Sequence, residues 1–157
     1  MDNEKFRRAA DAIARNCIGV RLRLVNRVVT NLYDDALRPL GLKVSQLHIL
    51  VVTAKLGVAQ PQKVCDLFQL DASTLSRNVE RMRARGWLEV VPGADARTQS
   101  FRLTPQGRRK LEQAFPAWEQ AQQQAEELLG ENGVAPLAKL AGKIGGPETE
   151  CAFFLVW

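Results

Sequence analysis

An acid and a base at the tip of a turn-rich segment are the first residues that could do chemistry. Asp95 and Arg97 stand two positions apart in "GADARTQS", between two runs in which polar and apolar residues alternate. In an extended segment such residues point to the same side, so the carboxylate can hold the guanidinium and lower the ordering cost of binding. A narrow minor groove of DNA attracts a cation of this kind. We therefore expect Arg97 to read the minor groove and Asp95 to orient it. The alternative is a surface ion pair worth about 0–1 kcal/mol.

A second group of chemical side chains lies on a predicted helix that opens at Asp71 and closes at Gly86. Apolar residues at spacings of four and three predict its buried side, which consists of Leu75, Val79 and Met82. The opposite side carries short hydroxyls near the start and long bases further along. Such a helix fits the major groove of DNA, with its first turn near base edges and its later arginines near phosphates. We expect base contacts from Ser73, Thr74 and Arg77, and phosphate contacts from Arg81 and Arg85.

The distribution of charge favours the same partner. Nine bases and four acids lie between Asp71 and Lys110, so this quarter of the chain carries the whole net charge of +5, while the remainder holds 13 of each. Binding of a polyanion is the simplest physical use of such a segment. The alternative for the helix and for the basic segment is an ordinary solvated surface.

The surrounding elements must position these side chains. Helical spacing runs from Asp11 to Arg38 and gives two adjacent apolar stripes, so this long helix needs covering from more than one side, as by another subunit. Two short helices follow, "VSQLHILVVTAKLG" with Ser45 as its N-cap and "QPQKVCDLFQL", and together with the helix from Asp71 they indicate a helix-turn-helix.

After this unit the period changes from helical to two. "WLEVV" and "SFRL" predict a β-hairpin, Thr104 and Pro105 open a further helix that extends to Gly130, and "VAPLAKLAGKIGG" is a last amphipathic piece. A hairpin directly after a groove-sized helix makes a winged helix. The expected fold class is mostly α with a small β-hairpin wing.

Three stretches together resemble the MarR family of bacterial winged-helix regulators, over about residues 15–130: "NLYDDALRPLGLKVSQLHIL", "LDASTLSRNVERMRARGWLEV" and "DARTQSFRLTPQGRRKLEQA". The resemblance implies a homodimer with an N-terminal dimerisation helix (1–40), a winged helix-turn-helix lobe (41–104), C-terminal dimerisation helices (105–146) and an apolar tail of unknown role (147–157). It further implies binding to a pseudo-palindromic operator on double-stranded DNA, repression of neighbouring genes, and release by a small phenolic or other aromatic effector.

The candidates for effector or redox sensing are fewer. Some members of the family sense oxidants through a cysteine in the first helix, so the resemblance makes Cys17 a candidate, with Arg21 on the same helix face to favour its thiolate. A small cysteine that is buried or lies in an interface is the alternative. His48 could line a pocket for an acidic ligand and Trp118 could border one, whereas a structural role is the alternative for both.

Other function classes find little support. A thiol peroxidase using Cys17 would need a base or a resolving cysteine nearby, so we expect no enzyme and no catalytic residue. A winged helix that binds protein and never DNA stays a lesser alternative. Cysteines at 17, 65 and 151 are widely spaced without a CxxC pair, which indicates neither a disulfide framework nor a zinc site and favours a reducing cytoplasm. We expect no metal and no cofactor. No signal peptide and no membrane span are expected.

Overall fold

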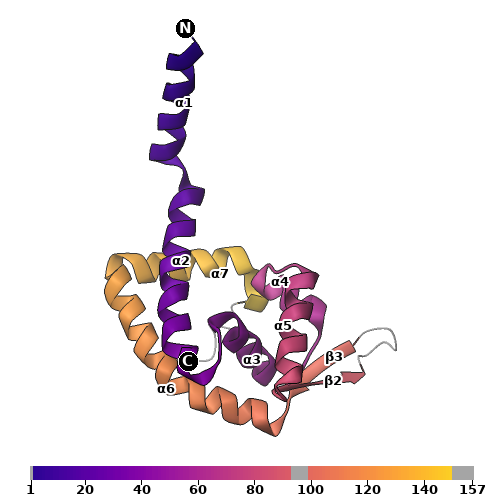
Figure 1. Cartoon of the computed structure of the whole chain (residues 1–157). Helices are drawn as coiled ribbons and strands as arrows, with labels where there is room; N and C mark the ends of the chain where they lie inside the picture. The colour runs from indigo at the N-terminus through magenta and orange to yellow at the C-terminus, as the bar shows by residue number, and fades with distance from the viewer. Residues whose placement is uncertain (1, 93–98, 150–157) are drawn as a thin grey trace.

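The computed structural model describes residues 2–92 and 99–149, so Asp95 and Arg97 lie outside the described residues. Helices dominate, and a small sheet sits at one side of the molecule (Figure 1). The elements in chain order are α1 (Asp2–Asn16), α2 (Ile18–Leu37), the 3-10 turn η1 (Arg38–Leu40), α3 (Val44–Leu56), β1 (Val58–Ala59), α4 (Pro61–Phe68), α5 (Ala72–Ala84), β2 (Leu88–Pro92), β3 (Gln99–Leu103), α6 (Pro105–Leu129) and α7 (Glu131–Thr149). The predicted fold class is confirmed.

The long N-terminal helix is interrupted, contrary to the single helix expected over 11–38. Cys17 adopts an extended conformation (φ −67°, ψ 108°) between α1 and α2. The break is one residue long, since α1 ends at Asn16 and α2 begins at Ile18. The helical hydrogen bond from the Cys17 amide to the Ile13 carbonyl, at 2.9 Å, is still present. Cysteine and the nearby Gly19 are both poor helix formers, which makes this position the weak point of the helix. Helix α1 continues beyond α2 and projects away from the rest of the molecule (Figure 1).

The lobe formed by α3, α4, α5 and the sheet contains the main hydrophobic core. Leu75 and Met82 of α5 are fully buried and Val79 packs against the same core, which confirms the predicted buried side of this helix. Helix α3 begins at Val44 with Lys43 as its N-cap, so the predicted cap at Ser45 is wrong. The reason is a long-range contact, since the Val44 amide donates to the Asp34 carboxylate of α2 at 2.8 Å.

The sheet holds three antiparallel strands in the order β1-β3-β2. Strands β2 and β3 pair in the register Leu88 with Leu103, which confirms the expected hairpin, whose tip at residues 93–98 lies outside the described part. Strand β1 was not predicted, because two residues carry no alternation of their own and become a strand only by pairing with β3. The sheet thus ties the end of α3 to the wing.

Helix α6 starts close against the hairpin. The Thr104 amide donates to the Trp87 carbonyl at 3.1 Å, and the Thr104 hydroxyl caps α6 by accepting from the Gly107 amide at 2.9 Å. A Cβ atom at Gly107 would stand 2.0 Å from the Trp87 carbonyl oxygen. The glycine of "LTPQG" is therefore required by a close approach between two backbones.

Helices α2, α6 and α7 frame the other side of the molecule (Figure 1). Helix α6 continues through Pro116 and packs along α2, where the Tyr33 hydroxyl donates to the Gln122 side chain. Large apolar side chains remain exposed on this frame and on α1, among them Phe6, Ile13, Ile18, Leu22, Leu24, Leu137, Leu140 and Ile144. Over residues 2–92 and 99–149 no helix is long and apolar enough to cross a bilayer.

Candidate nucleic-acid interface

The first turn of α5 is organised by Asp71. Its carboxylate accepts three hydrogen bonds: from the Ser73 hydroxyl at 2.6 Å, from the Thr74 hydroxyl at 2.7 Å and from the Thr74 amide at 2.8 Å. These bonds hold the pKa of the Asp71 carboxyl well below its ordinary value. The bond from the Ser73 hydroxyl has the largest effect, and the two bonds from Thr74 follow. Asp71 and Ser73 are exposed and Thr74 is half-buried, so the capped turn is presented to solvent.

The bases of α5 extend from this turn along the exposed side of the helix. Arg77 donates to the Ser73 carbonyl at 3.3 Å and lies 3.4 Å from the Thr74 hydroxyl oxygen. Arg77 and Arg81 are exposed, opposite the buried Leu75 and Met82. The structure therefore brings four of the predicted DNA-binding residues to the solvent side of one helix: Ser73, Thr74, Arg77 and Arg81.

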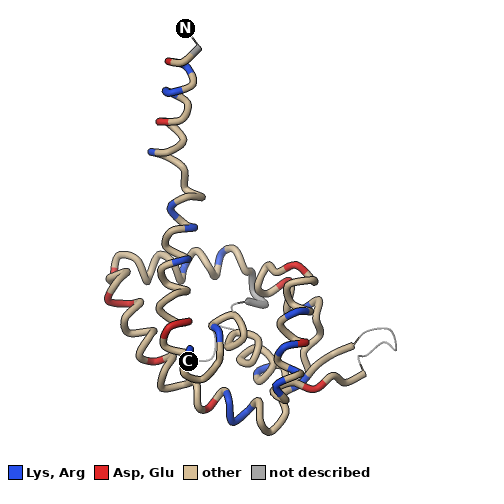
Figure 2. Tube along the Cα trace, in the orientation of Figure 1, with Lys and Arg blue, Asp and Glu red and all other residues tan. Residues whose placement is uncertain are grey.

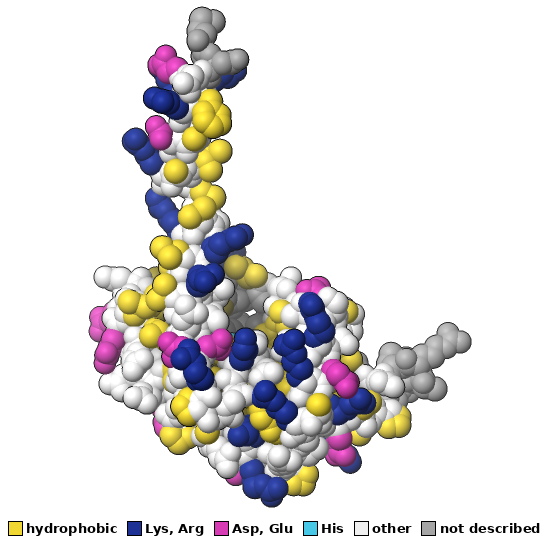
Figure 3. Space-filling model, viewed as in Figure 1, with side chains coloured by type: hydrophobic (Ala, Val, Ile, Leu, Met, Phe, Trp, Pro, Cys, Tyr) yellow, Lys and Arg dark blue, Asp and Glu magenta, His cyan; other side chains and the backbone are white. Residues whose placement is uncertain are grey.

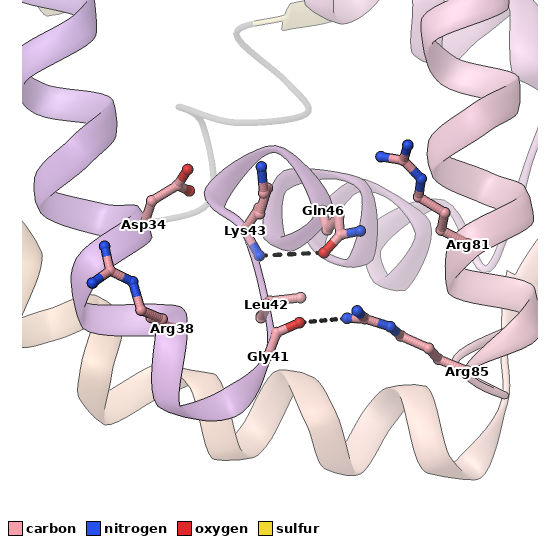
Figure 4. Close-up of a pocket in the computed structure, with 8 residues that line it drawn as sticks. All are labelled: Asp34, Arg38, Gly41, Leu42, Lys43, Gln46, Arg81 and Arg85. Atoms are coloured by element: carbon pink, nitrogen blue, oxygen red, sulfur yellow. Dashed lines mark hydrogen bonds between the residues drawn. The ribbon is translucent and has the colours of Figure 1, made fainter.

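A basic pocket of about 550 Å³ lies between α5 and the corner where α2 passes into α3. It is lined by Asp34, Arg38, Gly41, Leu42, Lys43, Gln46, Arg81 and Arg85. Figure 4 shows Arg81 reaching from α5 toward α2, whereas the Arg85 side chain ends on the Gly41 carbonyl. Arg85 also lies over the Trp87 ring, with its guanidinium carbon 5.0 Å from the ring centroid. Arg85 thus connects the end of α5 to the α2–α3 corner.

Arg38 and Lys43 belong to this basic surface, and the sequence reasoning missed them. They lie about 40 residues before Arg81 in the chain, so no local spacing links them to α5. In Figure 3 the Lys and Arg side chains gather on the face over α5 and this corner, and the trace in Figure 2 gives the same arrangement. The basic surface is therefore wider than the recognition helix alone.

The residues predicted for effector or redox sensing lie on separate elements. Cys17 is half-buried at the α1–α2 junction, where the Arg21 side chain donates to the Arg15 carbonyl. His48 of α3 stacks on Phe68 with ring centroids 5.9 Å apart, and partial desolvation lowers the pKa of His48 although the residue as a whole is exposed. Trp118 of α6 stacks on Phe115 at 5.8 Å. The wing residues Asp95 and Arg97 lie outside the described residues.

Comparison with known proteins gives a consistent result. A family model described as "MarR family" matches residues 40–98, which span the helix-turn-helix and the first wing strand. The multiple antibiotic resistance protein MarR of Salmonella typhimurium is 28% identical over 130 residues, 81% of this chain and 90% of that protein. A crystal structure of mutant MarR from E. coli with operator DNA is 24% identical and has a TM-score of 0.74 over 84% of this chain and 96% of the other. At this identity the similarity establishes that the two chains share a fold.

Two further solved structures are more similar in sequence to this chain than the E. coli MarR structure is. A probable transcriptional regulator from Pseudomonas aeruginosa is 26% identical, with a TM-score of 0.73 over 83% of this chain and 98% of that chain. The regulator MosR of M. tuberculosis, crystallised with DNA, is 30% identical, with a TM-score of 0.71 over 82% of this chain and 96% of its own. With this identity over nearly the whole of MosR and a family match across the helix-turn-helix, the chain belongs to the MarR family of transcriptional regulators.

Proposed function

We propose that this regulator, which is not an enzyme, binds a pseudo-palindromic operator as a homodimer and represses the neighbouring genes. The observation that carries the proposal is the exposed side of α5, where Ser73, Thr74, Arg77 and Arg81 lie opposite the buried Leu75 and Met82. With 13 residues, α5 is about 20 Å long at about 1.5 Å per residue, and a major groove about 12 Å wide admits such a helix.

Within the proposed complex the side chains have different tasks. Ser73, Thr74 and Arg77 face bases, because they occupy the part of α5 nearest its start. Arg81 contacts phosphate, and Arg38 and Lys43 across the basic pocket extend that contact. Arg85 acts mainly as a connector, since its side chain is engaged by Gly41 and Trp87.

The wing completes the contact in this proposal. Arg97 enters the minor groove and Asp95 orients it, on a hairpin whose strands are fixed by β2–β3 pairing and by the Trp87–Gly107 approach. The described strands support a projecting wing, as they lead away from the body of the molecule (Figure 1).

A second copy of the chain covers the apolar surface of the frame. Monomeric proteins rarely leave a large contiguous apolar patch in water, and exposed apolar side chains occur along α1, α2 and α7. We infer that the segments 1–40 and 105–146 form the dimer interface and that the lobe at 41–104 is the DNA-binding unit. A two-fold dimer then contacts half-sites about 10 base pairs apart.

Release from DNA has two candidate mechanisms. Family resemblance supports a small phenolic or other aromatic effector, with His48 and Trp118 as candidate contacts. The second candidate is oxidation at Cys17, favoured because this half-buried thiol occupies the one-residue break between two helices. Both act in the reducing cytoplasm that the cysteine spacing indicates.

Selection of bound duplexes from a random library tests the function directly. We expect enrichment of a pseudo-palindrome by the wild-type dimer and a severe loss of binding for Arg97→Ala in a mobility-shift assay, with the dimer unchanged in size-exclusion chromatography with light scattering. Repeating the shift with peroxide and with a panel of aromatic acids separates the two release mechanisms. Equal binding by Arg97→Ala and wild type would refute the wing assignment, and no enrichment by wild type would favour a protein-binding winged helix.

A further inference from the structure

The direction of two hydrogen bonds on α5 restricts what its first turn can recognise. A serine or threonine hydroxyl has one proton to donate, and an ionised carboxylate can only accept. The Ser73 and Thr74 hydroxyl oxygens lie 2.6 and 2.7 Å from the two Asp71 carboxylate oxygens. Both hydroxyl protons are therefore directed to Asp71, and neither is available to a ligand.

What the Asp71, Ser73 and Thr74 side chains still offer is a set of acceptors. The Ser73 and Thr74 hydroxyl oxygens keep lone pairs, and so do the carboxylate oxygens of Asp71. The nearby Arg77 lies 3.4 Å from the Thr74 hydroxyl oxygen, a contact that uses a lone pair and leaves the direction of the Thr74 proton unchanged. A phosphate oxygen is also an acceptor and is negatively charged, so these three side chains are poorly matched to the DNA backbone. A base edge with an amino group is the matching partner.

We propose that Asp71 is a specificity-determining residue, which leaves the Ser73 and Thr74 hydroxyls as acceptors only and so selects adenine or cytosine over guanine or thymine at the base that Ser73 faces. In the major groove adenine presents its N6 amino group and cytosine its N4 amino group, whereas guanine and thymine present carbonyl oxygens at those positions. The inference rests on the proposed function, because it assigns a base preference to the helix that enters the groove.

The Asp71→Asn variant separates proton direction from helix capping. Asparagine caps helices as well as aspartate, so the bond from the Thr74 amide can persist. Its amide nitrogen would donate to a hydroxyl oxygen and free that hydroxyl proton for a base carbonyl. Glu80→Gln is the matched control, since it also replaces an exposed carboxylate of α5 by an amide, at a residue paired with Arg83 at 2.9 Å. Ser73→Ala removes the hydroxyl itself.

The experiment is selection from random duplexes with these four proteins, followed by competition binding between duplexes that differ at one base pair. We expect wild type and Glu80→Gln to prefer an amino base at one position of each half-site. Asp71→Asn should lose that preference by roughly fivefold to tenfold, given the usual cost of a mismatched contact in the groove, and tolerate a carbonyl base there. Ser73→Ala should lose the preference at the same position without gaining one for a carbonyl base.

The outcomes are distinct. If wild type selects a defined operator and the Asp71→Asn and Ser73→Ala profiles match that of Glu80→Gln, the inference is overturned while the proposed function stands. If wild type enriches no duplex, the proposed function fails and the inference fails with it. Thermal unfolding of each variant shows whether it folds, and Ser73→Ala, which leaves Asp71 to cap the Thr74 amide, tests the base preference even if Asp71→Asn does not fold.

Discussion

Replacement of Gly107 by alanine tests how the wing is attached to the rest of the molecule. The added Cβ would lie 2.0 Å from the Trp87 carbonyl oxygen and 3.0 Å from its carbonyl carbon. Since Cβ atoms in proteins essentially never lie within 3.0 Å of such an atom, the start of α6 and the backbone at Trp87 must separate by about 1 Å. The Thr104 amide, which donates to the same Trp87 oxygen at 3.1 Å, would lose this bond.

The expected cost follows from these contacts. Overpacking typically costs about 1–3 kcal/mol and a lost hydrogen bond about 1 kcal/mol. Alanine offsets up to about 1 kcal/mol of this through its better helix propensity. We therefore expect the free energy of unfolding to fall by about 1–4 kcal/mol, against the roughly 5–15 kcal/mol of an ordinary domain.

Urea denaturation followed by circular dichroism measures this change, at one fixed protein concentration because dimerisation contributes to apparent stability. Gly19→Ala is the matched control, since its Cβ would meet only the Cys17 sulfur at 3.8 Å, and it should leave the midpoint unchanged or raise it. A Gly107→Ala protein with the wild-type midpoint would refute the account of why this position is glycine.

Two further changes have defined outcomes. Thr104→Ala removes the hydroxyl that caps α6 by accepting from the Gly107 amide at 2.9 Å, and it should lower the free energy of unfolding by about 1 kcal/mol. Thr104→Ser keeps the hydroxyl and should cost less. Equal urea midpoints for wild type, Thr104→Ala and Thr104→Ser would contradict the cap. His48 has a lowered pKa in the folded state because its ring is partly desolvated, so the unfolded chain binds more protons near pH 6 and stability must fall as the pH drops through the unfolded value of about 6.5. Thermal unfolding from pH 7.5 to 5 should therefore show wild type losing stability relative to His48→Gln, and parallel profiles would disprove the desolvation.

The features that the sequence predicted are those that depend on local spacing. The two sides of α5 follow from Leu75, Val79 and Met82 at helical intervals, and the hairpin follows from alternation on either side of a turn. Thr104 is the N-cap of α6 and Pro105 is its first residue, as the sequence predicts.

The features that it did not predict depend on contacts between distant segments. Asp34 caps α3 from another helix and moves its start from the expected Ser45 cap to Lys43. Strand β1 exists only through β3, and Lys43 reaches the basic pocket only because the α2–α3 corner packs beside α5. Positions 17 and 19 hold weak helix formers, which is the one local signal for the break at Cys17. The apolar spacing continues across these positions and therefore predicted a single helix.

The salt dependence of DNA binding tests most directly whether the basic face of α5 grips the duplex. Fluorescence anisotropy with a selected duplex should show log affinity falling linearly with log salt concentration, because bound phosphates release counterions. Arg81→Gln should reduce that slope by about 1, while Lys5→Gln, on the projecting α1, should leave it unchanged. An affinity that does not vary with salt, or a slope that Arg81→Gln leaves intact, would contradict the proposed interface.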